Sequence, residues 1–230
     1  MSRSPRAAEG GLVYHAMNRG NAGVAICDDD GDFEAFRQVL AEAVARHAMR
    51  LLAYCVVPDH FQMVLWPRAD GDLSQFMRWL TMTHTQRWHA QHHTAGSGHL
   101  YQGRFKSFPV QDDGHLVTVC RYVERSALNA GLVACAEDWP WGSLRQHGRG
   151  RKAADPRIPA LSAWPIARPR RWAARVNAAL RPAEEEALQR SLQRGQPFGT
   201  PEWQADTAAR LGLESTFRPR GRPRKSRNGS

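Results

Sequence analysis

Residues 51–66 of the chain read LLAYCVVPDHFQMVLW, two apolar runs separated by a proline and an aspartate. Each run has the length of a β-strand, and Pro58-Asp59 is a typical turn pair. A connection of two residues joins only adjacent antiparallel strands, because parallel strands need a longer crossover. The stretch therefore predicts a β-hairpin with strands at 51–57 and 60–66.

Segments on both sides of this hairpin continue the pattern of strands and helices. Apolar runs of strand length predict strands at 12–18 and 105–111. Apolar residues spaced three and four apart predict helices at 30–47, at 73–93 and from Asp112 or Asp113 through Tyr122 to about Ala127. The order is strand, helix, strand, strand, helix, strand, helix. It predicts an α+β fold, with an antiparallel sheet and helices on its faces.

The composition changes after Trp141. Residues 148–170 are rich in Arg, Pro and Ala, which predicts a linker or a loosely packed wrap. Two short helices are expected at 183–193 and 201–211, followed by a basic tail without acidic residues that is disordered on its own. The sequence thus predicts three parts: a main α+β domain at 1–147, a linker with a C-terminal helical extension at 148–216, and the tail at 217–230.

The overall charge points to a polyanionic partner. Lys and Arg outnumber Asp and Glu by 32 to 22, which gives a net charge of +10, and such a balance favours nucleic acids through counterion release. No stretch reaches the roughly 20 apolar residues of a membrane-spanning helix, and no secretory signal is recognisable. The four cysteines form no C-x-x-C pair, so we expect a reduced, intracellular protein.

Two groups of polar side chains are candidates for chemistry. His60 and Gln62 are two apart on a strand and therefore share one face, where imidazole and amide oxygen can ligate a divalent ion. A hydrogen-bonded structural histidine is the alternative. Tyr122 and Ser126 are four apart on a helix and also share a face. For Tyr122 the alternative is a packed ring with its hydroxyl at the rim.

Four segments carry a resemblance to a known family when they are taken in order. They are YHAMNRGN at 14–21, YCVVPDHFQMVLW at 54–66, YQGRFK at 101–106, and RYVER at 121–125 with AGLV at 130–133. The series resembles the REP-associated tyrosine transposases, relatives of the IS200/IS605 transposases in the HUH superfamily of single-strand nucleases. The resemblance covers about residues 11–147 and extends into the C-terminal part.

The resemblance implies a ferredoxin-like fold, a single catalytic tyrosine and a site for Mg²⁺ or Mn²⁺. By position, Tyr122 matches the nucleophile and His60 matches the first metal-ligating histidine. Gln62 stands where the family has its second histidine, and Ser126 stands where it has an asparagine ligand. With these two replacements we expect weaker metal binding and a preference for Mn²⁺.

The implied reaction is metal-dependent cleavage and transfer of single-stranded DNA at REP-type hairpins through a 5′-phosphotyrosine. Because one tyrosine is available, strand transfer requires a homodimer or sequential use of one site. We expect a cytoplasmic, nucleoid-associated bacterial protein without a membrane partner. Two alternatives stay open: a catalytically decayed protein that binds palindromic repeats as a regulator or structural binder, and an RNA-binding protein.

Several residues are predicted to contact DNA independently of the metal. Arg19, Arg104 and Lys106 are candidates for the phosphate backbone, with simple surface solvation as the alternative. The tail resembles an AT-hook, in which extended arginines enter a narrow minor groove; its candidates are Arg218, Arg220, Arg222, Arg224 and Lys225. A histidine-rich helical face at 84–93 and the aromatic residues Trp79, Trp88, Tyr101 and Phe105 are weaker candidates for phosphate contact and base stacking.

Overall fold

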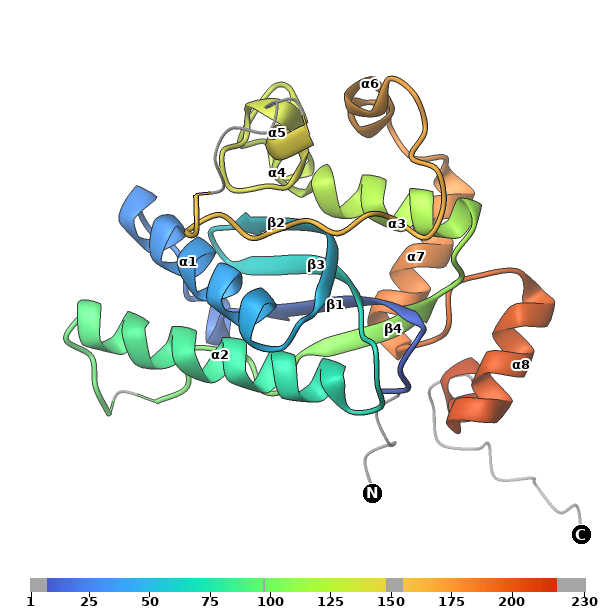
Figure 1. The fold of residues 1–230 in the computed structure, drawn as a ribbon, viewed down its shortest axis with the longest axis horizontal. Helices are drawn as coiled ribbons and strands as arrows, with labels where there is room; N and C mark the ends of the chain where they lie inside the picture. Colours follow the sequence, from blue (N-terminus) through green and yellow to red (C-terminus); the bar gives the residue numbers. More distant parts are fainter. Residues whose placement is uncertain (1–7, 97, 148–154, 219–230) are drawn as a thin grey trace, which may run out of the picture.

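The computed structural model describes residues 8–96, 98–147 and 155–218 (Figure 1). Its centre is a four-stranded antiparallel sheet in the order β2-β3-β1-β4. The strands are β1 (Val13–Arg19), β2 (Arg50–Val57), β3 (His60–Trp66) and β4 (Lys106–Val110). The predicted hairpin is β2 and β3, joined by Pro58-Asp59, and the predicted ferredoxin-like α+β fold is confirmed.

Helices cover both faces of this sheet. On one face, α1 (Asp30–Arg46) and α2 (Asp72–Gln91) form a core with the inward residues of the strands, among them the fully buried Phe36 and Phe61. Burial of each such ring contributes roughly 2–3 kcal/mol. On the other face lie α3 (Gly114–Glu124) and α4 (Ser126–Asn129), with a second core. Asp113 caps α3, as predicted, by accepting a hydrogen bond from the backbone N–H of His115.

The helix that carries Tyr122 is shorter than predicted. It was expected to reach about Ala127, but α3 ends at Glu124 and α4 begins at Ser126. The Ser126 hydroxyl donates to the Val123 carbonyl at 2.7 Å. A serine hydroxyl that takes a backbone carbonyl in this way competes with the helical hydrogen bonds, which accounts for the break.

The C-terminal part packs against the sheet, contrary to the predicted loose wrap. Residues 155–170 form a strap along β2, where Ser162 N donates to Leu51 O and Trp164 Nε1 donates to Leu52 O. The prediction also missed a helix within this region. The elements beyond α4 are η2 (Ala136–Asp138), α5 (Leu144–His147), α6 (Trp172–Asn177), α7 (Pro182–Arg194), α8 (Pro201–Leu211) and η3 (Glu214–Phe217); a short η1 (Asn21–Gly23) follows β1.

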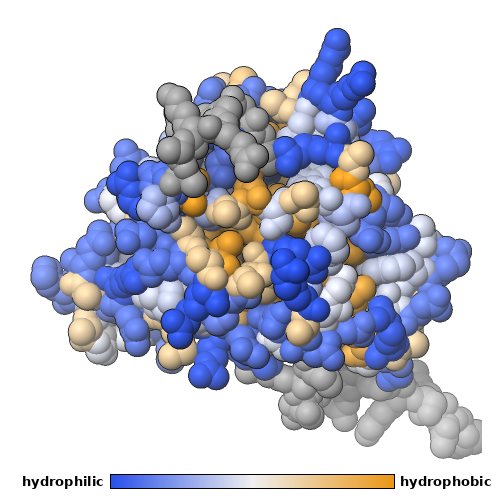
Figure 2. Space-filling view, in the orientation of Figure 1, coloured by the Kyte–Doolittle hydropathy of each residue, from blue (hydrophilic) through white to orange (hydrophobic). Residues whose placement is uncertain are grey.

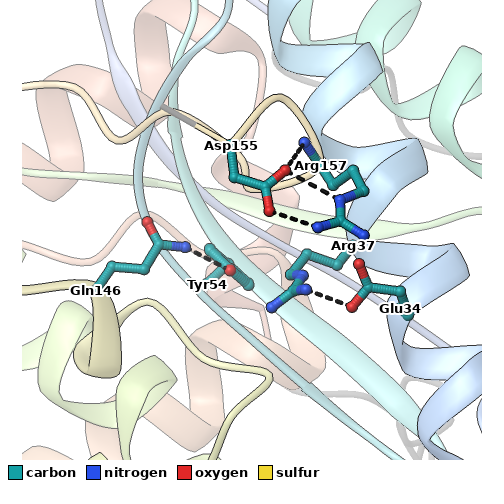
Figure 3. Close-up of polar contacts among 6 residues, drawn as sticks. All are labelled: Glu34, Arg37, Tyr54, Gln146, Asp155 and Arg157. Carbon is teal, nitrogen blue, oxygen red and sulfur yellow. Dashed lines mark hydrogen bonds and ion pairs between the residues drawn. The ribbon is translucent and has the colours of Figure 1, made fainter. Parts of the chain in front are cut away.

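The strap closes over α1 and β2 with both apolar and polar contacts. Figure 2 shows apolar side chains gathered over α1 and the strap, within a largely hydrophilic surface. Leu161 of the strap packs against the first core. Beside it, Asp155 pairs with Arg157, and Gln146 donates to the Tyr54 hydroxyl at 2.6 Å (Figure 3). The strap is thus a fixed part of the fold.

Both edges of the sheet are occupied by other segments of the same chain. Along β2, Val56 N donates to Trp141 O, and Ser143 N donates to Tyr54 O. Along β4, Phe198 N donates to Pro109 O. Occupied edges do not offer a template for pairing with another chain. A homodimer would therefore need a surface other than these strand edges.

The second core joins the parts that the sequence divides at residue 147. Trp172, Val176, Leu188 and Phe198 share it with the residues of α3. The division into three parts stays a prediction, because shared packing does not show which parts fold alone. No helix in the described ranges is both long and apolar enough to cross a lipid bilayer.

Candidate active site

Gln62 is the centre of a buried polar network on the α3 side of the sheet. It lies on β3, between β2 and β1, and is only 4% exposed. Its Nε2 lies 3.0 Å from Ser126 Oγ and 3.3 Å from His60 Nε2. The residues that the sequence predicted as a metal site, His60, Gln62 and Ser126, are therefore brought together by β3 and the start of α4.

The other end of the Gln62 amide contacts a residue that the sequence reasoning missed. Gln62 Oε1 lies 2.9 Å from Nε2 of His15 on β1. His15 is fully buried, and burial lowers its pKa to about 4. The ring is therefore neutral at physiological pH. The signal was present in the YHAMNRGN segment, but only the register of β1 against β3 places His15 beside Gln62.

The corner that carries His60 is held by the backbone around it. Gly20 N donates to Asp59 O at 2.8 Å, and a Cβ at Gly20 would lie 1.8 Å from Val24 O, so this position requires glycine. His60 Nδ1 donates to Asp59 Oδ1 at 2.7 Å. This contact fixes the tautomer and leaves the lone pair of Nε2 facing Gln62.

The arrangement of these side chains does not fit a divalent ion. His60 Nε2 and Ser126 Oγ offer lone pairs, but Gln62 turns its amide N–H group toward them and its carbonyl toward His15. An amide nitrogen is a donor and not a metal ligand. The three residues converge as predicted, while the ligand role of Gln62 stays a prediction that requires the amide to turn.

Tyr122 is the tyrosine that lies at this network. The chain has four tyrosines. The hydroxyl of Tyr14 donates to Glu9 O, that of Tyr54 binds Gln146 (Figure 3), and that of Tyr101 binds His84. These three rings are buried in the first core. Tyr122 is half-buried on the opposite face of the sheet, one helical turn before Ser126.

Two amides approach the Tyr122 hydroxyl. Gln189 of α7 donates to it from 3.4 Å, and the Gln62 amide lies near enough to affect its pKa. Burial raises the pKa of Tyr122 above its ordinary value, as does the nearby Glu185, whereas both amides lower it. The phenol is therefore held in its protonated form at neutral pH, with donors already placed for the charge that ionisation would create.

The residues next to Tyr122 bind α3 to the C-terminal extension. Arg121 donates to the carbonyls of Arg175, Ala178 and Ala179, and Arg125 donates to those of Val176 and Asn177. These carbonyls lie at the C-terminal end of α6, where they lack helical partners. Beside them, the buried Glu124 carboxylate accepts from Ser143 Oγ and Trp172 Nε1, both at 2.5 Å. The extension thus fixes the helix that carries Tyr122.

Two predicted DNA contacts lie beside the network. Arg19 is the cross-strand partner of His60, and Lys106 pairs with Met17, which in turn pairs with Gln62. Cross-strand partners point to the same face of a sheet, so both exposed cations share the face of Gln62. Arg104 is exposed just before β4 begins, rather than on the strand as predicted.

The histidine-rich face of α2 is not the free phosphate surface that the sequence predicted. His84 is buried against Tyr101, His89 pairs with Thr94, and His92 pairs with Asp32. Arg87 makes two hydrogen bonds to Glu42. Tyr101 and Phe105, predicted as stacking platforms, are buried. Arg218 is exposed at the end of η3, and Arg220, Arg222, Arg224 and Lys225 lie outside the described residues.

A second group of potential ligands lies where α1 and α2 meet. Asp28, Asp32 and His92 place their ligand atoms within 4.8 Å of one another. Asp32 already accepts hydrogen bonds from Asp28 N, Gln91 and His92. These bonds explain the arrangement as a connection between the start of α1 and the end of α2.

The two buried neutral histidines predict a pH dependence of stability. His15 and His84 both have pKa values lowered to about 4 by burial, whereas an unfolded histidine titrates near 6.5. Unfolding then takes up protons as pH falls below 6.5. The free energy of unfolding should decrease by up to about 1.4 kcal/mol per pH unit for each histidine, until about pH 4. Urea titrations near pH 7 and pH 5 measure this decrease in the free energy of unfolding. His84→Phe should remove about half of it. An equal decrease in wild type and variant would contradict the assignment of a lowered pKa to His84.

The fold and this site define a class of protein. In it, a ferredoxin-like sheet carries a histidine and an amide on a central strand, and a tyrosine lies beside them on the helix after the last strand. The chain belongs to the family described as "Transposase IS200 like", whose model matches residues 10–126. The match ends at Ser126 and includes every residue of the network. Transposases of this family process DNA during transposition and generally depend on a divalent metal ion.

Two solved structures are similar to this chain. One is a REP-associated tyrosine transposase bound to a REP hairpin, with 18% sequence identity and a TM-score of 0.53; the match covers 64% of this chain and 84% of that one. The other is a putative transposase from Deinococcus radiodurans R1, with 17% identity and a TM-score of 0.36, over 54% of this chain and 97% of that one. The first shows that the fold is shared. No curated protein matches the chain in sequence.

Proposed function

We propose that this chain cleaves and rejoins single-stranded DNA at hairpin-forming, REP-type sequences, with Tyr122 as the nucleophile. The observation that carries the proposal is the position of Tyr122. Of the four tyrosines, three have their hydroxyls committed within the first core, and Tyr122 lies with Gln62 and Ser126 on the face that Arg19 and Lys106 share. The hairpin substrate is inferred from the transposase of the same fold that was solved with a REP hairpin.

Each residue has a distinct task in the proposed reaction. The exposed cations Arg19 and Lys106 attract the phosphate backbone. The Tyr122 oxygen gives up its proton and attacks the phosphorus, and the bond between the phosphorus and the 3′ oxygen breaks. The 3′ oxygen takes up a proton, which leaves a 5′-phosphotyrosine and a free 3′ hydroxyl. The N–H donor of Gln189 stabilises negative charge on the tyrosine oxygen. The covalent bond retains the energy of the phosphodiester, so a 3′ hydroxyl can reverse the step without ATP.

A covalent-adduct assay tests the proposal directly. The full chain is incubated with a labelled pool of hairpin oligonucleotides that have randomised single-stranded flanks, with Mn²⁺, with Mg²⁺ or with a chelator. We expect a denaturation-resistant adduct, and sequencing of the trapped DNA identifies the target. Tight binding without an adduct under all three conditions would contradict the proposal.

A second candidate function is binding of palindromic repeats without chemistry. It is favoured by the orientation of the Gln62 amide, which closes the network without a metal ion. In that case the protein would bind the hairpin oligonucleotides without cutting them, and Tyr122→Phe would leave the affinity for them unchanged. The adduct assay therefore separates the two candidates.

The basic tail should add affinity that depends on salt. Removal of residues 217–230 deletes six Lys and Arg side chains, each of which can neutralise a phosphate. The affinity for hairpin DNA should fall more at low salt than at high salt, and the slope of log affinity against log salt should become shallower by about 0.9 for each lost contact to the duplex stem. Fluorescence anisotropy at several salt concentrations measures both. Equal slopes for the two proteins would remove the tail from the binding surface.

A further inference from the structure

The neighbours of Gln62 decide which end of its amide faces the site. Ser126 gives its hydroxyl proton to Val123 O, and His60 gives its Nδ1 proton to Asp59. The atoms that face Gln62, Ser126 Oγ and His60 Nε2, are therefore both acceptors. An amide nitrogen satisfies them, whereas a carbonyl would bring unshielded lone pairs together. In the absence of a cation, the N–H end must point inward.

His15 fixes the same orientation from the outer end of the amide. Its Nε2 lies 2.9 Å from Gln62 Oε1, and its ring stacks on Phe108 with centroids 4.8 Å apart and an interplanar angle of 18°. The opposite ring nitrogen, Nδ1, is buried and has no hydrogen-bond partner among the described residues. At a buried position without a partner, an unprotonated ring nitrogen costs less free energy than an N–H group, because unpaired buried donors are rarer in proteins than unpaired buried acceptors. The proton therefore belongs on Nε2, where it is donated to Gln62.

We propose that His15 is a positioning residue that holds the N–H end of the Gln62 amide toward Tyr122, Ser126 and His60. At rest both N–H groups of Gln62 then donate to Ser126 and His60, and the site lacks the carbonyl oxygen that a complete set of metal ligands would need. A divalent ion gains Gln62 as a ligand only when the amide turns. The turned amide presents an N–H to His15, whose own proton must then move to the buried Nδ1 without an acceptor.

The consequence is that His15 opposes metal binding at this site. Partners behind a metal ligand ordinarily orient it toward the ion, and their removal lowers the affinity by 10- to 100-fold. Here removal should have the opposite effect, because it frees the amide to turn its oxygen inward. The inference rests on the proposed function for the role of Tyr122, but the His15–Gln62 pair can be measured without DNA.

Mn²⁺ binding to the DNA-free full chain tests this, with wild type, His15→Phe and His84→Phe compared by titration calorimetry. His15→Phe keeps the stacking on Phe108 and should raise the Mn²⁺ affinity about tenfold, because it removes the hydrogen bond that stabilises the metal-free orientation of the Gln62 amide. His84 is a matched control, since it is also buried with a pKa lowered to about 4, and it lies in the first core against Phe36. An unchanged or lower affinity of His15→Phe, or an equal gain in His84→Phe, would overturn the proposal.

A second measurement uses the wild-type chain alone and does not depend on the folding of any variant. Long-range ¹H–¹⁵N correlation spectra of the labelled protein distinguish the two neutral tautomers of His15. We expect the proton on Nε2 in metal-free protein; a proton on Nδ1 would overturn the proposal. If Tyr122 forms no adduct with DNA, the proposed function fails, while the tautomer and the Mn²⁺ affinities still decide the role of His15.

Discussion

Tyr122→Phe should abolish covalent adduct formation and strand cleavage, with a loss on the order of 10⁴-fold or more. The substitution removes the attacking oxygen and leaves the ring packed on the second core. Because the hydroxyl makes one long hydrogen bond, to Gln189 at 3.4 Å, and lies near the Gln62 amide, its removal should change stability little. Gel analysis of the labelled adduct and thermal unfolding measure the two effects.

The matched control is Tyr54→Phe. The Tyr54 hydroxyl binds Gln146 beneath the strap, on the other face of the sheet from Gln62 (Figure 3). Its removal should leave the adduct intact. An adduct that survives in Tyr122→Phe, or that is lost equally in both variants, would show that the nucleophile has been misassigned.

Glu124→Ala should lower the free energy of unfolding by roughly 3 kcal/mol. The carboxylate is buried and accepts from Ser143 and Trp172, so the substitution leaves both donors unpaired, and each unpaired buried donor costs about 1–3 kcal/mol. Since the same contacts fix α3 to α6, adduct formation should fall as well. Urea unfolding followed by tryptophan fluorescence measures the stability.

Glu186→Ala on α7 is the control for Glu124. Glu186 is exposed and, within the described ranges, pairs with Arg190 one turn later. Exposed pairs of this kind contribute less than about 0.5 kcal/mol, so the variant should unfold as the wild type does. Equal losses in the two variants would contradict the view that Glu124 anchors the C-terminal extension.

The β2–β3 hairpin was predictable because its information is local. The two-residue connection at Pro58-Asp59 determines the hairpin, and strand alternation places His60 and Gln62 on one face. The break between α3 and α4 was not predictable from apolar periodicity. It depends on the Ser126 hydroxyl taking the Val123 carbonyl, and serine in a helical pattern leaves that choice open.

The contacts that were missed connect residues far apart in the chain. α6 is a helix of six residues in an Arg- and Pro-rich region, and its carbonyls are satisfied by Arg121 and Arg125 some 50 residues earlier. His15 meets Gln62 only through the pairing of β1 with β3. Neither relation has a local signature. The prediction that Tyr122 belongs to the same site as Gln62 came from the family resemblance, since a helical tyrosine alone is usually a packed ring.

The proposed reaction depends most on Tyr122, whose hydroxyl oxygen becomes joined to DNA. The most direct measurement is protease digestion of the trapped adduct, followed by mass spectrometry of the peptide that carries the nucleotide. We predict that the nucleotide is attached at Tyr122, in the segment RYVER at residues 121–125. Attachment at another residue, or cleavage of the DNA without any covalent intermediate, would contradict the account.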